Sequence, residues 1–104
     1  MTEVEKAWIG AMLQADGCVS RFGEQGRGYK YWRFTFTNTD IELVSTVLRL
    51  TGMGGVSYHP PPPLRPDGYP RSEWWTWELA NQPKVNQLAQ DLAPYCTKAR
   101  KVLE

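Results

Sequence analysis

The fold of this chain is decided by the stretch Trp8-Ile9-Gly10-Ala11-Met12-Leu13-Gln14-Ala15-Asp16-Gly17. At about 100° per residue, the stretch predicts a helix with one arc of large apolar side chains and one arc that is almost bare. The bare arc consists of Ala7, Gly10, Ala11, Gln14 and Ala15. Because small side chains let another backbone come close, we expect a second helix to pack against this arc.

The end of this helix carries the first functional clue. We expect the helix to stop at Asp16-Gly17, since glycine is a common C-terminal cap. An acid in the last turn faces the negative end of the helix dipole, which costs from a few tenths of a kcal/mol to ~1 kcal/mol unless a cation lies nearby. An Asp-Gly turn that simply ends a helix is the alternative interpretation of the pair. The unfavourable position of the Asp16 charge is therefore the first indication of a functional site.

Residues 9–17 resemble the signature of the LAGLIDADG homing endonucleases, with Gln14 at the place of the first acid of that signature. In that family two copies of the helix pack together through small residues, and the last acid of each copy holds divalent metal at the scissile phosphates. The resemblance implies that Asp16 and the backbone carbonyl of Ala15 bind Mg²⁺ or Mn²⁺, which prefer oxygen ligands. It also implies a homodimer interface made by Ala7, Gly10, Ala11 and Gln14.

The remaining sequence predicts an α+β fold in the order αββαββα, followed by a short C-terminal helix. Helices are expected over residues 3–15, 40–50, from 81 to Pro94, and 95–103, and strands over 18–22, 29–38, 56–59 and 72–79. This order is that of one LAGLIDADG half-unit with a four-stranded antiparallel sheet. The resemblance therefore covers the chain as a single domain, residues 1–104.

Local patterns support these elements. Thr2 and Glu5 have capping-box spacing, and Asn38 or Thr39 is expected to cap the second helix. That helix is expected to bury Ile41, Val44, Val47 and Leu48. In the second strand Trp32, Phe34 and Phe36 are expected to face inward, and Tyr31, Arg33, Thr35 and Thr37 outward. The position of Arg21 leaves the register of the first strand open.

Composition narrows the class of protein. The chain has 104 residues, 41% apolar and 22% charged, and a net charge of +1, as expected of one folded domain. It has neither an apolar run near ~18 residues nor a secretory leader, so we expect no membrane partner. Cys18 and Cys96 fit no zinc spacing and are expected to be buried thiols rather than a disulfide. The expected location is intracellular, in a prokaryote, a phage-infected cell or an organelle, and not secreted.

The charges are unevenly distributed, which matters for a nucleic-acid partner. Residues 18–39 contain Arg21, Arg27, Lys30 and Arg33 against one acid. Arg27 and Lys30 are expected to contact phosphates. The outward positions of the predicted sheet are expected to read double-stranded DNA in the major groove, although each of them is also an ordinary solvated sheet position. They are Ser20, Tyr31, Arg33, Thr35, Thr37, Ser57, His59, Arg71, Trp74 and Thr76.

The family resemblance also implies polar and basic groups near the attacking water. Asn38 matches a position where family members often have glutamine, and its alternative role is to start a helix. The position of the family's basic residue falls on Ala99, so Lys98 or Arg100 is expected to supply the charge. This departure leaves the active site open to question.

These observations favour a homodimeric, metal-dependent, site-specific double-strand DNA endonuclease with a pseudo-palindromic target. The first alternative is a cleavage-deficient DNA- or RNA-binding module of the same fold, such as an intron maturase or a regulator. The second is a small dimeric α+β protein without a nucleic-acid role, which the near-neutral net charge supports.

Overall fold

The computed structural model describes residues 1–23, 31–63, 68 and 72–104. It confirms the α+β class, with a single four-stranded antiparallel sheet in the order β1-β2-β4-β3. Within the described residues no helix has the length and apolar content to cross a membrane. The elements are α1 (Glu3–Asp16), β1 (Gly17–Phe22), β2 (Tyr31–Asn38), α2 (Ile41–Thr51), β3 (Gly55–His59), β4 (Trp74–Leu79), α3 (Gln82–Leu92) and α4 (Thr97–Leu103).

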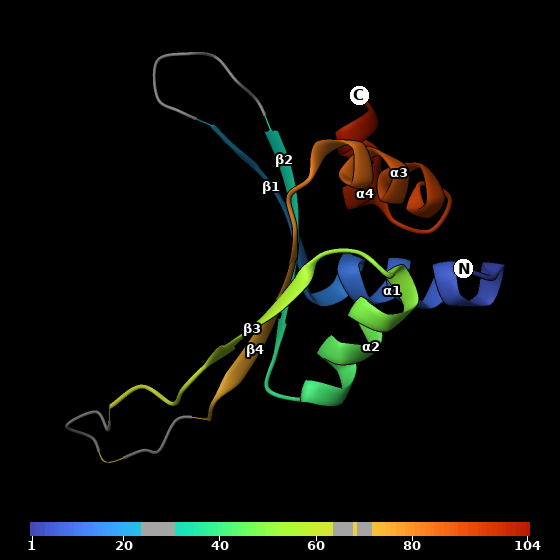
Figure 1. Cartoon of the computed structure of the whole chain (residues 1–104). Helices are drawn as coiled ribbons and strands as arrows, with labels where there is room; N and C mark the ends of the chain where they lie inside the picture. Colours follow the sequence, from blue (N-terminus) through green and yellow to red (C-terminus); the bar gives the residue numbers. More distant parts are fainter. Residues whose placement is uncertain (24–30, 64–67, 69–71) are drawn as a thin grey trace.

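The two faces of the sheet have different surroundings. All four helices lie on one side of the sheet, and in the described part of the chain no helix covers the other side (Figure 1). The covered face buries Phe34, Phe36 and Trp77, each 0% exposed, against apolar side chains of the helices. The Trp77 indole donates a hydrogen bond of 2.9 Å to the carbonyl oxygen of Met53, so this buried polar group is satisfied. The predicted inward set of β2 is confirmed.

The register of β1 settles the position of Arg21. Ser20 pairs with Arg33 and Arg21 pairs with Trp32, so Ser20 lies on the open face and Arg21 on the helix side. The Arg21 guanidinium carbon lies 4.4 Å from the centre of the Trp32 ring. A cation–π contact at the end of the sheet therefore accounts for a charged residue on the apolar side of the strand.

The helix ends follow the sequence with two corrections. Thr2 and Glu5 form the predicted capping box, with bonds of 2.8 and 3.1 Å. The cap of α2 is Asp40, which accepts from the backbone N–H of Glu42 at 2.9 Å, so the assignment to Asn38 or Thr39 was wrong. Strand pairing with β4 continues to Asn38 and delays the helix. Ile41 is 40% exposed rather than buried, because it is the first residue of a helix that begins at the end of the sheet.

Candidate active site and nucleic-acid interface

The C-terminal end of α1 positions Asp16. Asp16 is the last residue of the helix and is exposed, and β1 begins at the next residue. Gly17 donates its backbone N–H to the carbonyl oxygen of Leu13. A Cβ atom at Gly17 would lie 2.7 Å from the Leu13 Cα, so the turn from α1 into the sheet requires glycine. This close turn holds the Asp16 carboxylate at the junction of helix and sheet.

A cation from α4 reaches the same junction. The Lys98 ammonium donates to the carbonyl oxygen of Gly17 at 2.8 Å and to that of Leu13 at 3.4 Å. A positive charge at this point offsets the negative end of the helix dipole, next to which Asp16 adds a further negative charge. Lys98 thus places a cation at the helix end that carries Asp16.

The other basic candidate lies elsewhere. Arg100 donates through Nε to the carbonyl oxygen of Ala93 at 2.6 Å, in the connection between α3 and α4. Ala99, the position matched to the family's basic residue, is 0% exposed and belongs to the core. A charged side chain at position 99 would therefore have to displace core packing, whereas the Lys98 side chain reaches the end of α1 from the neighbouring position.

The bare arc of α1 is used partly within the chain. A Cβ atom at Gly10 would lie 2.6 Å from the Cβ of Tyr95, so the glycine admits Tyr95 of its own chain. The Gln14 side-chain oxygen accepts from the backbone N–H of Lys98 at 3.1 Å and from the Cys96 thiol at 3.5 Å. On this side α1 meets the segment leading into α4, and the assignment of Gly10 and Gln14 to a dimer interface stays a prediction.

The rest of the arc remains accessible. Ala11 and Ala15 are exposed, Ala7 is half-buried, and Val4, one turn before Ala7 and Trp8, is 79% exposed. These residues recur at intervals of three to four along one side of α1. The accessible side of α1 is therefore apolar and made of short side chains.

Asn38 lies near the end of α1 in the sheet. Gly17 pairs with Phe36, and Asn38 is two residues further along β2, roughly 6–7 Å in strand length. The Asn38 side-chain oxygen accepts from the backbone N–H of Asp40 at 2.8 Å. This bond supports a local role for Asn38 in the turn before α2. A role near an attacking water stays a prediction.

The donor atoms at the end of α1 suit a hard divalent cation, but one chain offers few of them. Among the described residues no group of three or more His, Cys, Asp and Glu side chains is placed to hold a metal ion. The exposed Asp16 carboxylate and the Ala15 carbonyl are oxygen donors of the kind that Mg²⁺ accepts. A complete metal site would need further oxygen ligands from a second chain or from a substrate.

The open face of the sheet gathers the predicted base-reading side chains. Successive rows pair Ser20 with Arg33, Thr35 with Glu78, and Thr76 with both Thr37 and Ser57 across the strands. Residues in such rows project to the same side as their neighbours two positions along the strand. All the predicted positions that the structure describes fall on this face. Arg27, Lys30 and Arg71 lie outside the described residues.

The open face is polar in its middle and aromatic at its ends. The hydroxyl oxygens of Thr37 and Thr76 are 2.9 Å apart. His59 stacks on Trp74 with ring centres 5.0 Å apart and an interplanar angle of 6°, while Phe22 and Tyr31 pair at the other end. Hydroxyl, imidazole and aromatic groups are those that contact base edges and thymine methyl groups in a groove.

Glu78 was assigned no role from the sequence. Its Oε1 atom lies 3.6 Å from Nη1 of Arg33, and the two side chains are 47% and 39% exposed. The alternation of β4 placed Glu78 outward beside Thr76, which was the available signal. Its pairing with Arg33 depends on the order of the strands, which the sequence does not state.

Comparisons with known proteins were made on sequence and on structure. No protein-family model and no curated protein matches the sequence. The homing endonuclease I-CvuI in complex with its target superposes with a TM-score of 0.70 at 17% identity, and I-CvuI with an I-CreI target with 0.69 at 18%. The archaeal intron-encoded homing endonuclease I-Vdi141I complexed with DNA gives 0.67 at 16%. In each case the match covers 97% of this chain and 64% of the neighbour.

Proposed function

We propose that this chain, which has the fold of the LAGLIDADG homing endonucleases, is a site-specific double-strand DNA endonuclease that acts as a homodimer with divalent metal. The observation that carries the proposal is the placement of the exposed Asp16 carboxylate at the end of α1, with Lys98 bound to the same helix end. β1 leads from that end directly into an open, polar sheet face. A cleaving group and a reading surface are thus adjacent in one short chain.

The accessible side of α1 supports association of two copies. Val4, Ala7, Ala11 and Ala15 form an apolar stripe on which a second α1 can pack closely. Two-fold symmetry would bring two Asp16 carboxylates together and set two open faces side by side, so the target would be pseudo-palindromic. Gly10 and Gln14, also predicted at this interface, contact Tyr95, Cys96 and Lys98 of their own chain.

The chemistry follows from the groups at that end. Asp16, the Ala15 carbonyl and their copies, completed by phosphate oxygens, would hold Mg²⁺ or Mn²⁺, which offsets charge on the transition-state phosphate and favours hydroxide. The Lys98 ammonium would add positive charge beside the same phosphate. Asn38 is proposed as a polar group for the attacking water. Arg100 is not favoured as the basic group, since its guanidinium binds the Ala93 carbonyl.

A second candidate function is a DNA- or RNA-binding module of the same fold that does not cleave. The burial of Ala99 at the position of the family's basic residue favours it. The two candidates differ in cutting and agree in binding, so the two properties must be measured separately. A protein without a nucleic-acid role would bind no duplex even at ~50 mM salt, where phosphate contacts are strong.

The experiment begins with selection of bound duplexes from a random library by the full chain, followed by cleavage of the selected duplex with Mg²⁺. Asp16→Asn is expected to bind the duplex and to lose cleavage. Glu42→Gln is the matched control, because it removes one exposed acid on the helix side of the sheet. Cleavage by Asp16→Asn at the wild-type rate, or a monomer at the concentrations that cleave, would contradict the proposal.

A further inference from the structure

We propose that Arg33 and Glu78 act as one unit that reads a single G·C base pair in the major groove. The inference rests on the proposed DNA-binding function and names a base pair that the open face selects. It starts from the charges of that face. Among the described residues of the rows on the open face, Arg33 and Glu78 are the two that belong to the types Asp, Glu, Lys and Arg.

The geometry keeps both charged ends available. Arg33 on β2 and Glu78 on β4 lie in neighbouring rows, and their charged atoms are 3.6 Å apart. The Arg33 Nε atom is buried and has no hydrogen-bond partner in the described structure. The exposed 39% of the side chain therefore belongs to its other atoms. Its guanidinium carbon also lies 5.5 Å from the centre of the Phe22 ring. The Nε atom of the guanidinium is thus buried, while Nη1 faces Glu78.

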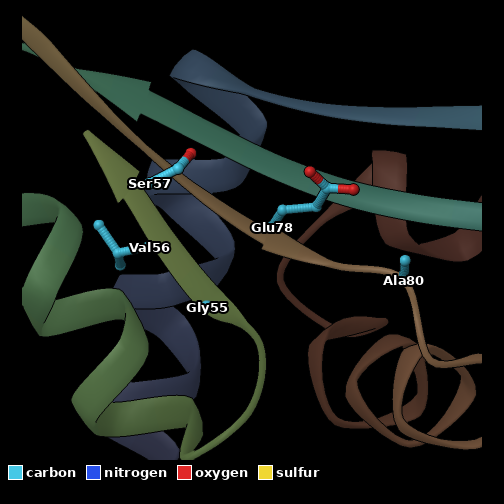
Figure 2. Close-up of a pocket in the computed structure, with 5 residues that line it drawn as sticks. All are labelled: Gly55, Val56, Ser57, Glu78 and Ala80. Carbon is cyan, nitrogen blue, oxygen red and sulfur yellow. The ribbon is translucent and has the colours of Figure 1, made fainter. Parts of the chain in front are cut away.

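A hollow lies beside Glu78 on the side of β3. The hollow is lined by Gly55, Val56, Ser57, Glu78 and Ala80 (Figure 2). Gly55 is the cross-strand partner of Glu78, and a Cβ atom there would meet nothing within 4 Å. Figure 2 shows the Glu78 side chain extending from β4 toward β2, away from Gly55 on β3. Because 47% of this side chain is exposed, the edge of a base can approach its carboxylate from the open face.

The pair matches the edge of a G·C pair. In the major groove guanine offers two acceptors, N7 and O6, and cytosine offers the N4 amino donor, whereas an A·T pair offers a different order and a methyl group. Guanine O6 and cytosine N4 are hydrogen-bonded to each other, so they lie ~3 Å apart. The separation of 3.6 Å between the Arg33 donor and the Glu78 acceptor is similar. Arg33 would donate to guanine while Glu78 accepts from cytosine.

A carboxylate on the open face also favours a role in the choice of base sequence rather than in the strength of DNA binding. A negative group facing DNA is repelled by phosphates and weakens binding to every sequence. The repulsion is offset where the carboxylate accepts a hydrogen bond from a base. Removal of Glu78 should then strengthen binding to non-cognate duplexes and weaken discrimination, a combination that a purely structural role would not produce.

The test is selection from a randomised duplex library, with the full chain, its Arg33→Gln and Glu78→Gln variants, and the Glu42→Gln control. The wild type is expected to select G·C at one position and at its symmetry mate, against A·T by ~10-fold to 100-fold. Arg33→Gln and Glu78→Gln are expected to reduce this preference to a few-fold. Glu42→Gln is expected to keep it, since Glu42 lies on α2.

The outcomes separate the two proposals. A wild type that enriches no duplex overturns the proposed function and this inference with it. A wild type that enriches a sequence, together with variants that keep the same base preferences, overturns the inference alone. If thermal unfolding shows that Arg33→Gln does not fold, Arg33→Met takes its place, because methionine keeps part of the apolar stem and has no donor for guanine. Unchanged guanine preference in Arg33→Met would also overturn the inference.

Discussion

Replacement of Lys98 by methionine tests whether α4 stabilises the end of α1. The Lys98 ammonium makes two hydrogen bonds there, to the carbonyl oxygens of Gly17 and Leu13. The bond to Leu13 contributes less, because the backbone N–H of Gly17 already donates to the same oxygen. Methionine keeps most of the apolar stem and removes the charge. A partly buried cation at a helix C-terminus contributes from 0.3 to ~2 kcal/mol. With the 2.8 Å bond to Gly17 included, we expect a loss of about 1–2 kcal/mol.

The assay is thermal and urea unfolding of the full chain, with Lys101→Met as the matched control. For a domain of this size the loss corresponds to a decrease in Tm of about 5–15 °C. Lys101 is an exposed residue of the same helix, so its replacement is expected to cost no more than ~0.5 kcal/mol. An equal effect of the two substitutions would refute the argument that Lys98 compensates the end of α1.

A double-mutant cycle with Asp16→Asn extends the same test to the candidate metal ligand. In the wild type the Lys98 ammonium binds the helix end whose last residue is Asp16. Without Lys98 that charge faces the helix dipole uncompensated, so Asp16→Asn is expected to stabilise the Lys98→Met protein more than the wild type, by several tenths of a kcal/mol. A coupling energy of zero would show that the two side chains do not share one electrostatic environment.

Three further predictions concern the rest of the chain. Gly10→Ala places a methyl group 2.6 Å from the Tyr95 Cβ, and overpacking of about 1–3 kcal/mol should lower the urea midpoint. The hydrogen bond from Tyr95 lowers the pKa of Glu3 below 4.5 and raises the pKa of Tyr95 above 10.0. The stabilisation from this hydrogen bond is therefore present between pH 4.5 and pH 10.0. It is lost as pH falls through the folded pKa of Glu3 or rises through the folded pKa of Tyr95, so Tyr95→Phe should flatten both limbs of the curve of Tm against pH. Thiol titration should label the exposed Cys18 in the native protein and the buried Cys96 after unfolding.

Strand faces could be predicted from the sequence because the period of two is fixed by strand geometry. Phe34, Phe36 and Trp77 are buried as the alternation required. The cap of α2 could not be predicted, because Asn38, Thr39 and Asp40 are all cap-forming residues. Which of them caps depends on how far β2 pairs with β4, a contact between segments distant in the sequence.

The small residues of α1 correctly predicted that another backbone packs closely against this helix. They did not show whether that backbone belongs to the same chain or to a second one. Gly10 does admit another backbone, but the backbone belongs to Tyr95 in the same chain. Helical periodicity identifies which side of α1 has small residues, but it does not show which chain packs against that side. The same holds for Gln14, whose contacts with Lys98 and Cys96 join α1 to α4. An amide oxygen and a carboxylate oxygen can both accept these bonds, which gives a physical reason for a departure from the family signature at this position.

The charges of the open face indicate how affinity and selectivity are divided in the proposed DNA complex. The charges of Arg33 and Glu78 cancel, so the sheet offers hydrogen-bonding groups without net attraction for phosphates. Affinity from counterion release needs further cations, and the sequence provides Lys30 among those expected at phosphates. Replacing Lys30 by a neutral residue should therefore reduce the magnitude of the slope of log K against log salt by ~0.9 for each phosphate contact that is lost. The selected sequence should stay unchanged. Substitutions at Glu78 should instead alter the selected sequence, because a carboxylate neutralises no phosphate.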